Sequence, residues 1–226
     1  MKGNSGTRSV DKTHVRKRLF EVKNYNRAEL RSITKEDLDL LNGIFSDAYL
    51  KAGVEPDSER IEINSVGLHL IDRKNLEFIV EYDPTDDSMK HDLFLIHNEE
   101  MRGKGLSKKV YGALLPIYEK LGIKKIRIHA GDENGGYTWA RYGFRASRGE
   151  ASSVIGRIKD DVLAEKAEAI FDEFYSSHPY STKFPMHLIS DKPWGKDALK
   201  GSKWFGELDL SDKEQKNRYV SYIRRK

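Results

Sequence analysis

Residues 102–107, Arg-Gly-Lys-Gly-Leu-Ser, have the types and spacing to hold a pyrophosphate. Two glycines let consecutive backbone N–H groups turn towards one point, and a helix that starts there adds its positive dipole end. Arg102, Lys104 and Lys108 supply formal charge. The glycine spacings of the P-loop and of the Rossmann fingerprint are both absent. The alternative is an ordinary glycine turn. The expected phosphate-binding residues are Arg102, Gly103, Lys104, Gly105, Leu106 and Ser107.

Four other residues could transfer protons. Glu81 ends one predicted strand, His97 and Glu99 end the next, and His129 ends a third. A carboxylate or imidazole at such a position can act as a general acid or base. The alternative is that these strand-end side chains are simply solvated. The His, Asp and Glu residues lack metal-ligand spacing, and there is no cysteine or Ser nucleophile elbow.

The elements that must position these residues follow from hydrophobic periodicity. Thr34 can cap a helix that ends at Gly53, and apolar residues at helical spacing follow the glycine turn from Leu106 to Leu121. A strand, a turn, this helix and a further strand form a βαβ unit, which predicts two adjacent parallel strands. The expected strands are Ile61–Ile71, Leu76–Tyr82, Asp92–His97 and Ile123–Ala130.

The second half of the chain is expected to contain shorter elements. A short helix from Tyr137 to Tyr142 precedes a strand that starts at Gly143-Phe144. A long helix covers Arg157–Ser176, and Met186–Ile189 and Trp204–Leu210 are expected to be short strands. The Trp- and Gly-rich segment 194–210 could form a lid or interaction surface, or a closing strand with an aromatic plug.

Composition limits the class of protein. Hydrophobic residues make up 38% of the 226 residues, charged residues 34%, and the mean hydropathy is −0.69. The longest apolar stretches, such as Ala113–Tyr118, are too short to span a bilayer, and the first ten residues lack the apolar core of a secretory signal. We therefore expect no membrane partner and a cytoplasmic location.

The charge is unevenly distributed. Residues 1–27 carry eight Lys or Arg and two acids, and residues 213–226 carry six Lys or Arg and one acid. Net charges of +6 and +5 at the ends leave −7 for the rest. We expect both ends to be mobile until they bind a nucleic acid or another polyanion, with solvated tails as the alternative. The expected organisation is a basic arm (1–27), a core (28–150) and a C-terminal extension (151–226).

The order of these features resembles the GNAT superfamily of N-acetyltransferases. Arg102, Gly105 and Ser107 match the family's glycine-turn pattern, and Asn134 and Gly143-Phe144 match its later motifs. The resemblance covers about residues 30–146, roughly half of the chain. It implies an α/β fold with a mixed, twisted sheet flanked by helices.

The resemblance also implies a cofactor and a reaction. Acetyl-CoA would place its pyrophosphate on residues 102–107, with Asn134 also near the cofactor, and its pantetheine arm would pair with Ile96 and His97. An amine then attacks the thioester, and a tyrosine protonates the leaving thiolate. The family tyrosine falls at Trp139, whose indole cannot replace a phenol as an acid. Tyr137 and Tyr142 are nearby candidates, although on a helix both would point away from the expected side.

Two functions follow from this resemblance. The first is an acyl-CoA-dependent N-acetyltransferase that acts on an amine, a protein lysine or a protein N-terminus. The second is a catalytically inactive structural or interaction protein. Its basis is a similarity to GNAT-like proteins of phages and mobile elements, which lies in residues 135–144 and in the Trp-rich ending. The second function implies a location in a virion.

Overall fold

Helix α2 (Lys35–Ala52) begins and ends where the sequence predicts. The computed structural model describes residues 33–57, 61–63, 67–83 and 85–225. Thr34 caps α2 by accepting a hydrogen bond from the Asp37 N–H, and the Asp37 carboxylate accepts one from the Thr34 N–H. Gly53 ends the helix with φ of 69°, a left-handed conformation that favours glycine.

The chain forms two compact units. The first contains the described residues up to Tyr82 together with Asp92–Leu121, and the second contains Asp83–His91 and Gly122–Lys226. The boundaries expected at residues 27 and 150 stay predictions, and the first of them lies outside the described residues. Strand β4 (Ser88–Ile96) contributes its first residues to the second unit and its last residues to the first.

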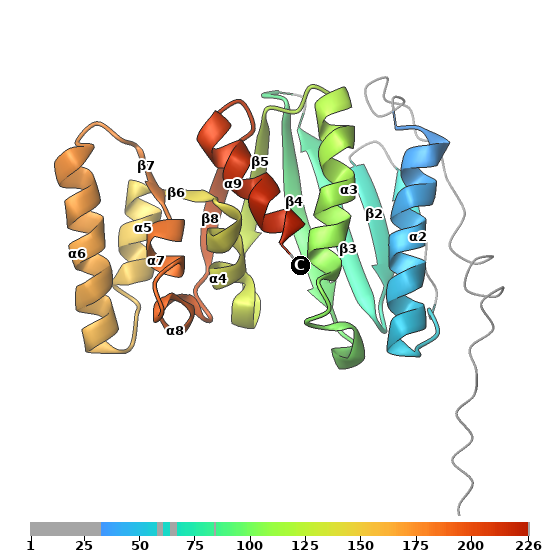
Figure 1. The fold of residues 1–226 in the computed structure, drawn as a ribbon, viewed down its shortest axis with the longest axis horizontal. Helices are drawn as coiled ribbons and strands as arrows, with labels where there is room; N and C mark the ends of the chain where they lie inside the picture. Colours follow the sequence, from blue (N-terminus) through green and yellow to red (C-terminus); the bar gives the residue numbers. More distant parts are fainter. Residues whose placement is uncertain (1–32, 58–60, 64–66, 84, 226) are drawn as a thin grey trace, which may run out of the picture. The chain divides into compact units, whose positions relative to one another are not determined.

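The first unit is an antiparallel arrangement covered by two helices. Strands β1 (Ile61–Ile63), β2 (Gly67–Asp72) and β3 (Leu76–Asp83) pair in that order, and β4 follows. Helices α2 and α3 (Leu106–Lys120) lie side by side on one face of these strands (Figure 1). Their core includes the rings of Phe45, Phe78 and Tyr111.

The second unit contains a mixed sheet. Ser88–His91 of β4 pairs in parallel with Lys125–Ile128 of β5 (Lys125–Ala130), which confirms the predicted parallel neighbours. Strand β8 (Trp204–Asp209) is antiparallel to both β5 and β6 (Arg145–Ser147), and β6 pairs with β7 (Lys183–Pro185). The order β4-β5-β8-β6-β7 therefore places the last strand in the middle of the sheet. The prediction of an α/β fold with a mixed sheet flanked by helices is confirmed.

Of the two alternatives for the Trp-rich ending, the closing strand is observed. Trp204 is fully buried in β8, and Gly206 and Leu208 continue its inward face. Helices α4 and α9 pack on this side of β5 and β8 (Figure 1). The helices of the second unit are α4 (Asp132–Tyr142), α5 (Arg148–Ile155), α6 (Asp161–Ser177), α7 (His187–Ser190), α8 (Gly195–Leu199) and α9 (Lys213–Arg224).

Several expected boundaries were wrong. Strand β4 begins at Ser88 rather than Asp92, and the segment expected as one strand at Ile61–Ile71 contains β1 and β2. Three further differences lie in the second half of the chain. The long helix expected at Arg157–Ser176 is α6, which starts later because the Asp160 carboxylate accepts a hydrogen bond from the Leu163 N–H and caps it. The strand expected at Met186–Ile189 is largely helix α7, and the strand β7 lies just before it. Helix α4 starts five residues before Tyr137.

The expectation of a mobile C-terminal end was also wrong. Residues 213–224 form α9, in which Tyr219 is fully buried. The Arg218 Nη2 donates to both carboxylate oxygens of Asp191, at 2.6 and 2.7 Å. This basic end is therefore packed onto its own unit, which provides Arg218 with an acidic partner. The basic arm, residues 1–27, lies outside the described residues.

Candidate functional site

The glycine turn of the first unit leads from the end of β4 into α3. A short 3-10 helix, η2 (Glu99–Met101), follows β4, and Gly103 and Gly105 then adopt φ values of 70° and 71°. Side chains disfavour this left-handed conformation, so both positions favour glycine. Gly105 is the N-cap of α3 and provides no side-chain cap. The first amides of α3 therefore have the orientation that binds anions.

Arg102 closes this turn. Its Nε donates to the Ile96 carbonyl at 2.8 Å, and its Nη2 donates to the His97 carbonyl at 3.5 Å. The guanidinium thus ties the turn back to the end of β4 while remaining exposed. Lys104 is exposed and Leu106 is buried, so the turn presents a cation outwards and an apolar anchor inwards.

The buried carboxylate of Asp72 supports the turn through a chain of hydrogen bonds. Asp72 is fully buried at the end of β2. Its carboxylate accepts hydrogen bonds from the Tyr49 hydroxyl at 2.7 Å, from the Asn75 side-chain amide at 2.8 Å and from the Lys74 N–H at 3.1 Å. A buried carboxylate with this many donors is well compensated for the loss of water.

Asn75 carries this support to the turn itself. Its backbone carbonyl accepts from the N–H groups of His97 and Asn98, at 2.9 and 3.2 Å, and its side-chain oxygen accepts from the Asn98 amide at 3.0 Å. Asn98 in turn caps η2 by accepting from the Glu100 N–H at 2.9 Å. Our sequence analysis did not select Asp72, Asn75 or Asn98. The pattern Asp-x-x-Asn at a predicted turn, and Asn before two acids, were signals that could have found them.

The same contacts occupy backbone groups that we expected to bind pantetheine. The His97 N–H donates to Asn75, and the Ile96 carbonyl accepts from Arg102. The Ile96 carbonyl keeps a second lone pair, but the His97 N–H has no second hydrogen. A pantetheine arm would therefore have to use Ile96 rather than the His97 N–H, or displace Asn75.

One of the expected acid–base residues, His97, has a carboxylate partner that the sequence did not predict. The His97 Nε2 lies 3.2 Å from the Glu77 carboxylate, and both side chains are about one third exposed or less. Glu99 is exposed in the first turn of η2. Glu81 is half-buried on β3, opposite Gly67 of β2. Side chains alternate along a strand, so Glu77, Ile79 and Glu81 lie on the same face of β3. This alternation was the signal that could have selected Glu77 together with Glu81.

Trp139, the residue at the family tyrosine position, is part of an aromatic cluster in the second unit. Its ring lies 5.1 Å from Phe144, 5.5 Å from Tyr142 and 5.8 Å from His91. His91 is almost completely buried on β4, and burial lowers its pKa to about 3, so its imidazole is neutral at pH 7. The cluster is thus uncharged at pH 7, with Tyr142, Phe144 and His91 buried and Trp139 partly exposed.

Tyr137 has a defined cationic neighbour. The Arg141 Nη1 donates to the Tyr137 hydroxyl at 2.6 Å, one turn further along α4. The guanidinium also lies over the ring of Tyr222, with 5.4 Å to the ring centre. The Tyr137 hydroxyl is used as an acceptor by Arg141 and keeps its own proton available for donation.

Two further candidates lie on the surface of the second unit. Asn134 is exposed in the first turn of α4. His129 is exposed near the end of β5, and its ring stacks on Phe205 of β8. The candidate residues therefore fall into two groups. Ile96, His97, Glu99 and residues 102–107 belong to the first unit together with Glu81, whereas the second unit holds His129, Asn134, Tyr137 and Trp139.

Two searches of the described residues gave no candidate. Within them, no group of three or more His, Asp or Glu side chains is arranged to hold a metal ion. No helix in the same ranges is both long enough and apolar enough to cross a membrane. Comparison with known proteins found no protein-family model, no curated protein and no solved structure that matches this chain.

Proposed function

We propose that the protein is an acyl-CoA-dependent N-acetyltransferase with a GNAT-like fold, and that its acceptor is an amine, a protein lysine or a protein N-terminus. One observation carries the proposal. The turn between β4 and α3 holds two left-handed glycines at an uncapped helix N-terminus, and β4 pairs in parallel with β5, the strand that follows α3. This combination supports a phosphate-binding turn within a βαβ unit.

In this proposal the turn binds the cofactor through its backbone. The amides of residues 103–107 and the dipole of α3 hold the pyrophosphate, and Lys104 adds charge. Arg102 keeps the turn in its binding conformation through its contact with the Ile96 carbonyl. Acetyl-CoA supplies the acyl group as a reactive thioester.

The first unit also offers a base for the acceptor amine. The His97 imidazole can take up a proton, and the Glu77 carboxylate orients the ring and stabilises the charged form. For the leaving thiolate, Trp139 provides no acid. Thiol pKa values lie near 8.5, so the thiolate can leave unaided, and the loss of an acid slows transfer by roughly 10²–10⁴.

The second candidate is a GNAT-like interaction protein without catalysis, for example in a phage virion. Two observations favour it: Trp139 is packed among aromatic rings, and the His97 N–H is already bonded to Asn75.

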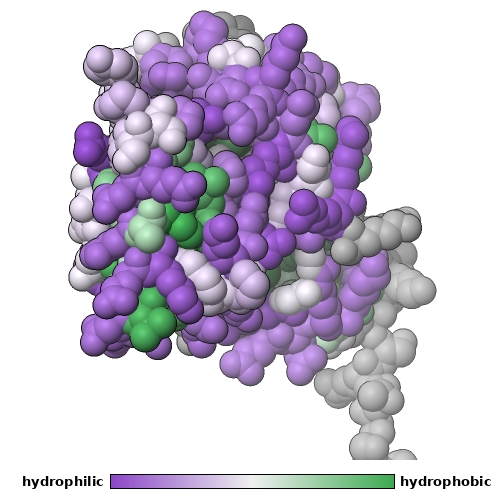
Figure 2. Space-filling model, turned by 60° about the vertical axis from the view of Figure 1, so that its left-hand side comes forward, coloured by the Kyte–Doolittle hydropathy of each residue, from purple (hydrophilic) through white to green (hydrophobic). Residues whose placement is uncertain are grey.

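The face seen in Figure 2 is mainly hydrophilic, with small, separate apolar groups. This face therefore lacks the large apolar patch that often marks a protein-binding surface. The location is cytoplasmic in the first proposal and virion-associated in the second.

A thiol-release assay separates the two. The protein is incubated with acetyl-CoA and a panel of amines and basic peptides, and free coenzyme A is measured. We expect slow release by the wild type, slower release by His97→Gln, which removes the proposed base, and wild-type release by the control His178→Gln, which makes the same exchange on an exposed histidine of the second unit. The absence of thiol release from the wild type, or equal release by His97→Gln and His178→Gln, would contradict the enzyme proposal.

A further inference from the structure

The sheet of the second unit has an outward face, opposite the side on which α4 and α9 pack. Side chains alternate along its central strands, so the inward residues of β5 are Ile126 and Ile128, and Arg127 and His129 point outwards. The register pairs Arg127 with Glu207 and His129 with Phe205. The outward face therefore has a charged part and, next to it, an aromatic part.

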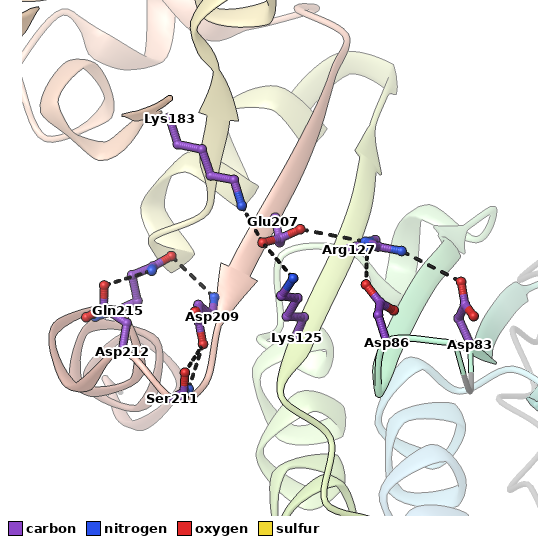
Figure 3. Close-up of polar contacts among 10 residues, drawn as sticks. All are labelled: Asp83, Asp86, Lys125, Arg127, Lys183, Glu207, Asp209, Ser211, Asp212 and Gln215. Carbon is purple, nitrogen blue, oxygen red and sulfur yellow. Dashed lines mark hydrogen bonds and ion pairs between the residues drawn. The ribbon is translucent and has the colours of Figure 1, made fainter. Parts of the chain in front are cut away.

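The charged part is balanced by its own ion pairs. Glu207 of β8 faces Lys125 at 3.9 Å, Arg127 at 3.7 Å and, in close contact, Lys183 (Figure 3). Arg127 is also bound to Asp86 and lies 3.7 Å from Asp83. These cations are already engaged by carboxylates, so this part has little unmatched charge for a ligand.

The aromatic part is a flat stack that faces water. The rings of His129 and Phe205 lie 4.3 Å apart with an angle of 12° between their planes. Phe205 is 63% exposed, the largest exposure of any phenylalanine in the described ranges. Single exposed apolar residues are common, but two stacked rings on neighbouring central strands form a platform with a defined plane.

Three exposed cations belong to the segments that adjoin Phe205. Lys200 and Lys203 are exposed in the segment that leads into β8, and neither ammonium group has a partner among the described residues. Arg157 is exposed and held in place, since its Nη2 donates to the Lys203 carbonyl at 3.2 Å. The one carboxylate with a described contact to Phe205 is Glu150, which accepts from its backbone N–H at 3.3 Å. The segment that precedes Phe205 therefore carries two exposed lysines, and Arg157 is anchored to it.

We propose that this platform binds single-stranded nucleic acid. An unpaired base has a flat face that stacks on an exposed aromatic ring, and each phosphate that follows requires a nearby cation. The outer face of the exposed Phe205 ring, backed by His129, provides the stacking surface, and Lys200, Lys203 and Arg157 in the adjoining segments provide cations for the phosphates. The proposal is independent of the acyl-CoA site. It also differs from binding by the basic ends, because none of these residues belongs to them.

Fluorescence anisotropy with a labelled 12-nucleotide oligo-dT tests the proposal on the full chain. Stacking of one base contributes enough that Phe205→Ala should weaken binding by about 10-fold or more. Phe205→Leu should be equally weak, because it keeps apolar area but loses the ring. The matched control Val162→Ala removes another exposed apolar side chain of the same unit, 58% exposed, and should bind within twofold of the wild type.

Salt dependence gives a second readout. Replacing both Lys200 and Lys203 by Ala should reduce the slope of log affinity against log salt by about 1.4, at roughly 0.7 per phosphate on a single strand. A blunt duplex of the same length should bind less tightly, since its bases are not available for stacking. No saturable binding by the wild type, or equal binding by Phe205→Ala and Val162→Ala, would overturn the proposal. Wild-type affinity in Phe205→Leu would overturn it as well.

Discussion

The surroundings of the glycine turn and of Trp139 are built in opposite ways. Beside the turn, in the first unit, buried polar groups fix a backbone conformation. The Asn75 amide donates to the Asp72 carboxylate, and the Asn75 oxygens accept from His97 and Asn98. Around Trp139, in the second unit, aromatic rings fill space and one buried histidine is kept neutral.

This difference means that the glycine turn is built to bind a ligand, whereas the surroundings of Trp139 are not built for acid catalysis. A polar network specifies geometry, because each donor and acceptor must keep its direction. An aromatic cluster specifies volume and offers no proton to a leaving group. The turn thus has the features of a ligand-binding element, whereas the position of the expected acid has those of a structural element.

The largest expected effect is at the base of the polar network. Asp72→Ala leaves the Tyr49 hydroxyl and the Asn75 amide without their buried acceptor, so we expect a loss of about 3–5 kcal/mol in the free energy of unfolding. Tyr49→Phe removes a single hydrogen bond and should cost about 1 kcal/mol. Urea denaturation measures both. Similar, small losses in the two variants would show that the network does not hold the turn.

The aromatic cluster should respond through packing alone. Trp139→Ala removes contacts with three rings, and we expect it to lower the free energy of unfolding by about 3 kcal/mol. Phe205→Ala is the control, because this ring is 63% exposed and its loss should change stability by about 0.5 kcal/mol at most. A Trp139→Ala protein as stable as the control would place Trp139 in an open cleft instead.

The buried histidine gives the cluster a pH dependence of known sign. Burial lowers the pKa of His91 to about 3 in the folded protein, against about 6.5 in the unfolded chain. Above pH 6.5 both states are neutral and the fold has its full stability. As the pH falls below 6.5, the unfolded chain takes up a proton that the folded protein does not, so stability decreases.

Between pH 7 and pH 5 this residue should account for a loss of about 2 kcal/mol. The variant His91→Phe should lose about that much less than the wild type over the same range, as measured by urea denaturation at each pH. His187, whose pKa is lowered to about 4 by burial and by Arg218, adds a similar dependence that remains in the variant. Equal pH dependence in the two proteins would mean that His91 reaches water.

Local signals explain how much of this fold could be predicted. Thr34 and Gly53 delimit α2, and the glycine turn with its helix predicts parallel neighbours, because these features are set by residues close in sequence. The insertion of β8 between β5 and β6 depends on pairing between residues at least 60 positions apart, which no local pattern encodes. Helix α9 is mostly polar, and only the spacing of Gln215 and Tyr219 marks its buried side.

The candidate site shows the same limit. The residues of the turn were predicted because glycine and charge are visible in the sequence. The partner of His97 was missed because Glu77 lies on another strand, and the role of Trp139 was uncertain until its neighbours were known. Contacts between strands and helices decide which candidate is a base, which is a cap and which is core.

Calorimetry with acetyl-CoA tests the central claim, that the turn at residues 102–107 binds the cofactor. Gly105 and Gly122 lie next to opposite ends of α3 with φ of 71° and 69°, and a Cβ at either would meet no other atom of the described chain within 4 Å. Gly105→Glu and Gly122→Glu therefore introduce the same strain and the same charge, but only the first places a carboxylate in the proposed pyrophosphate position.

We predict that the wild type binds acetyl-CoA, that Gly122→Glu binds within about twofold of it, and that Gly105→Glu is weaker by at least about tenfold because of repulsion between like charges. Circular dichroism confirms that both variants are folded. An absence of heat from the wild type at millimolar acetyl-CoA, or equal affinity in the two variants, would contradict the claim.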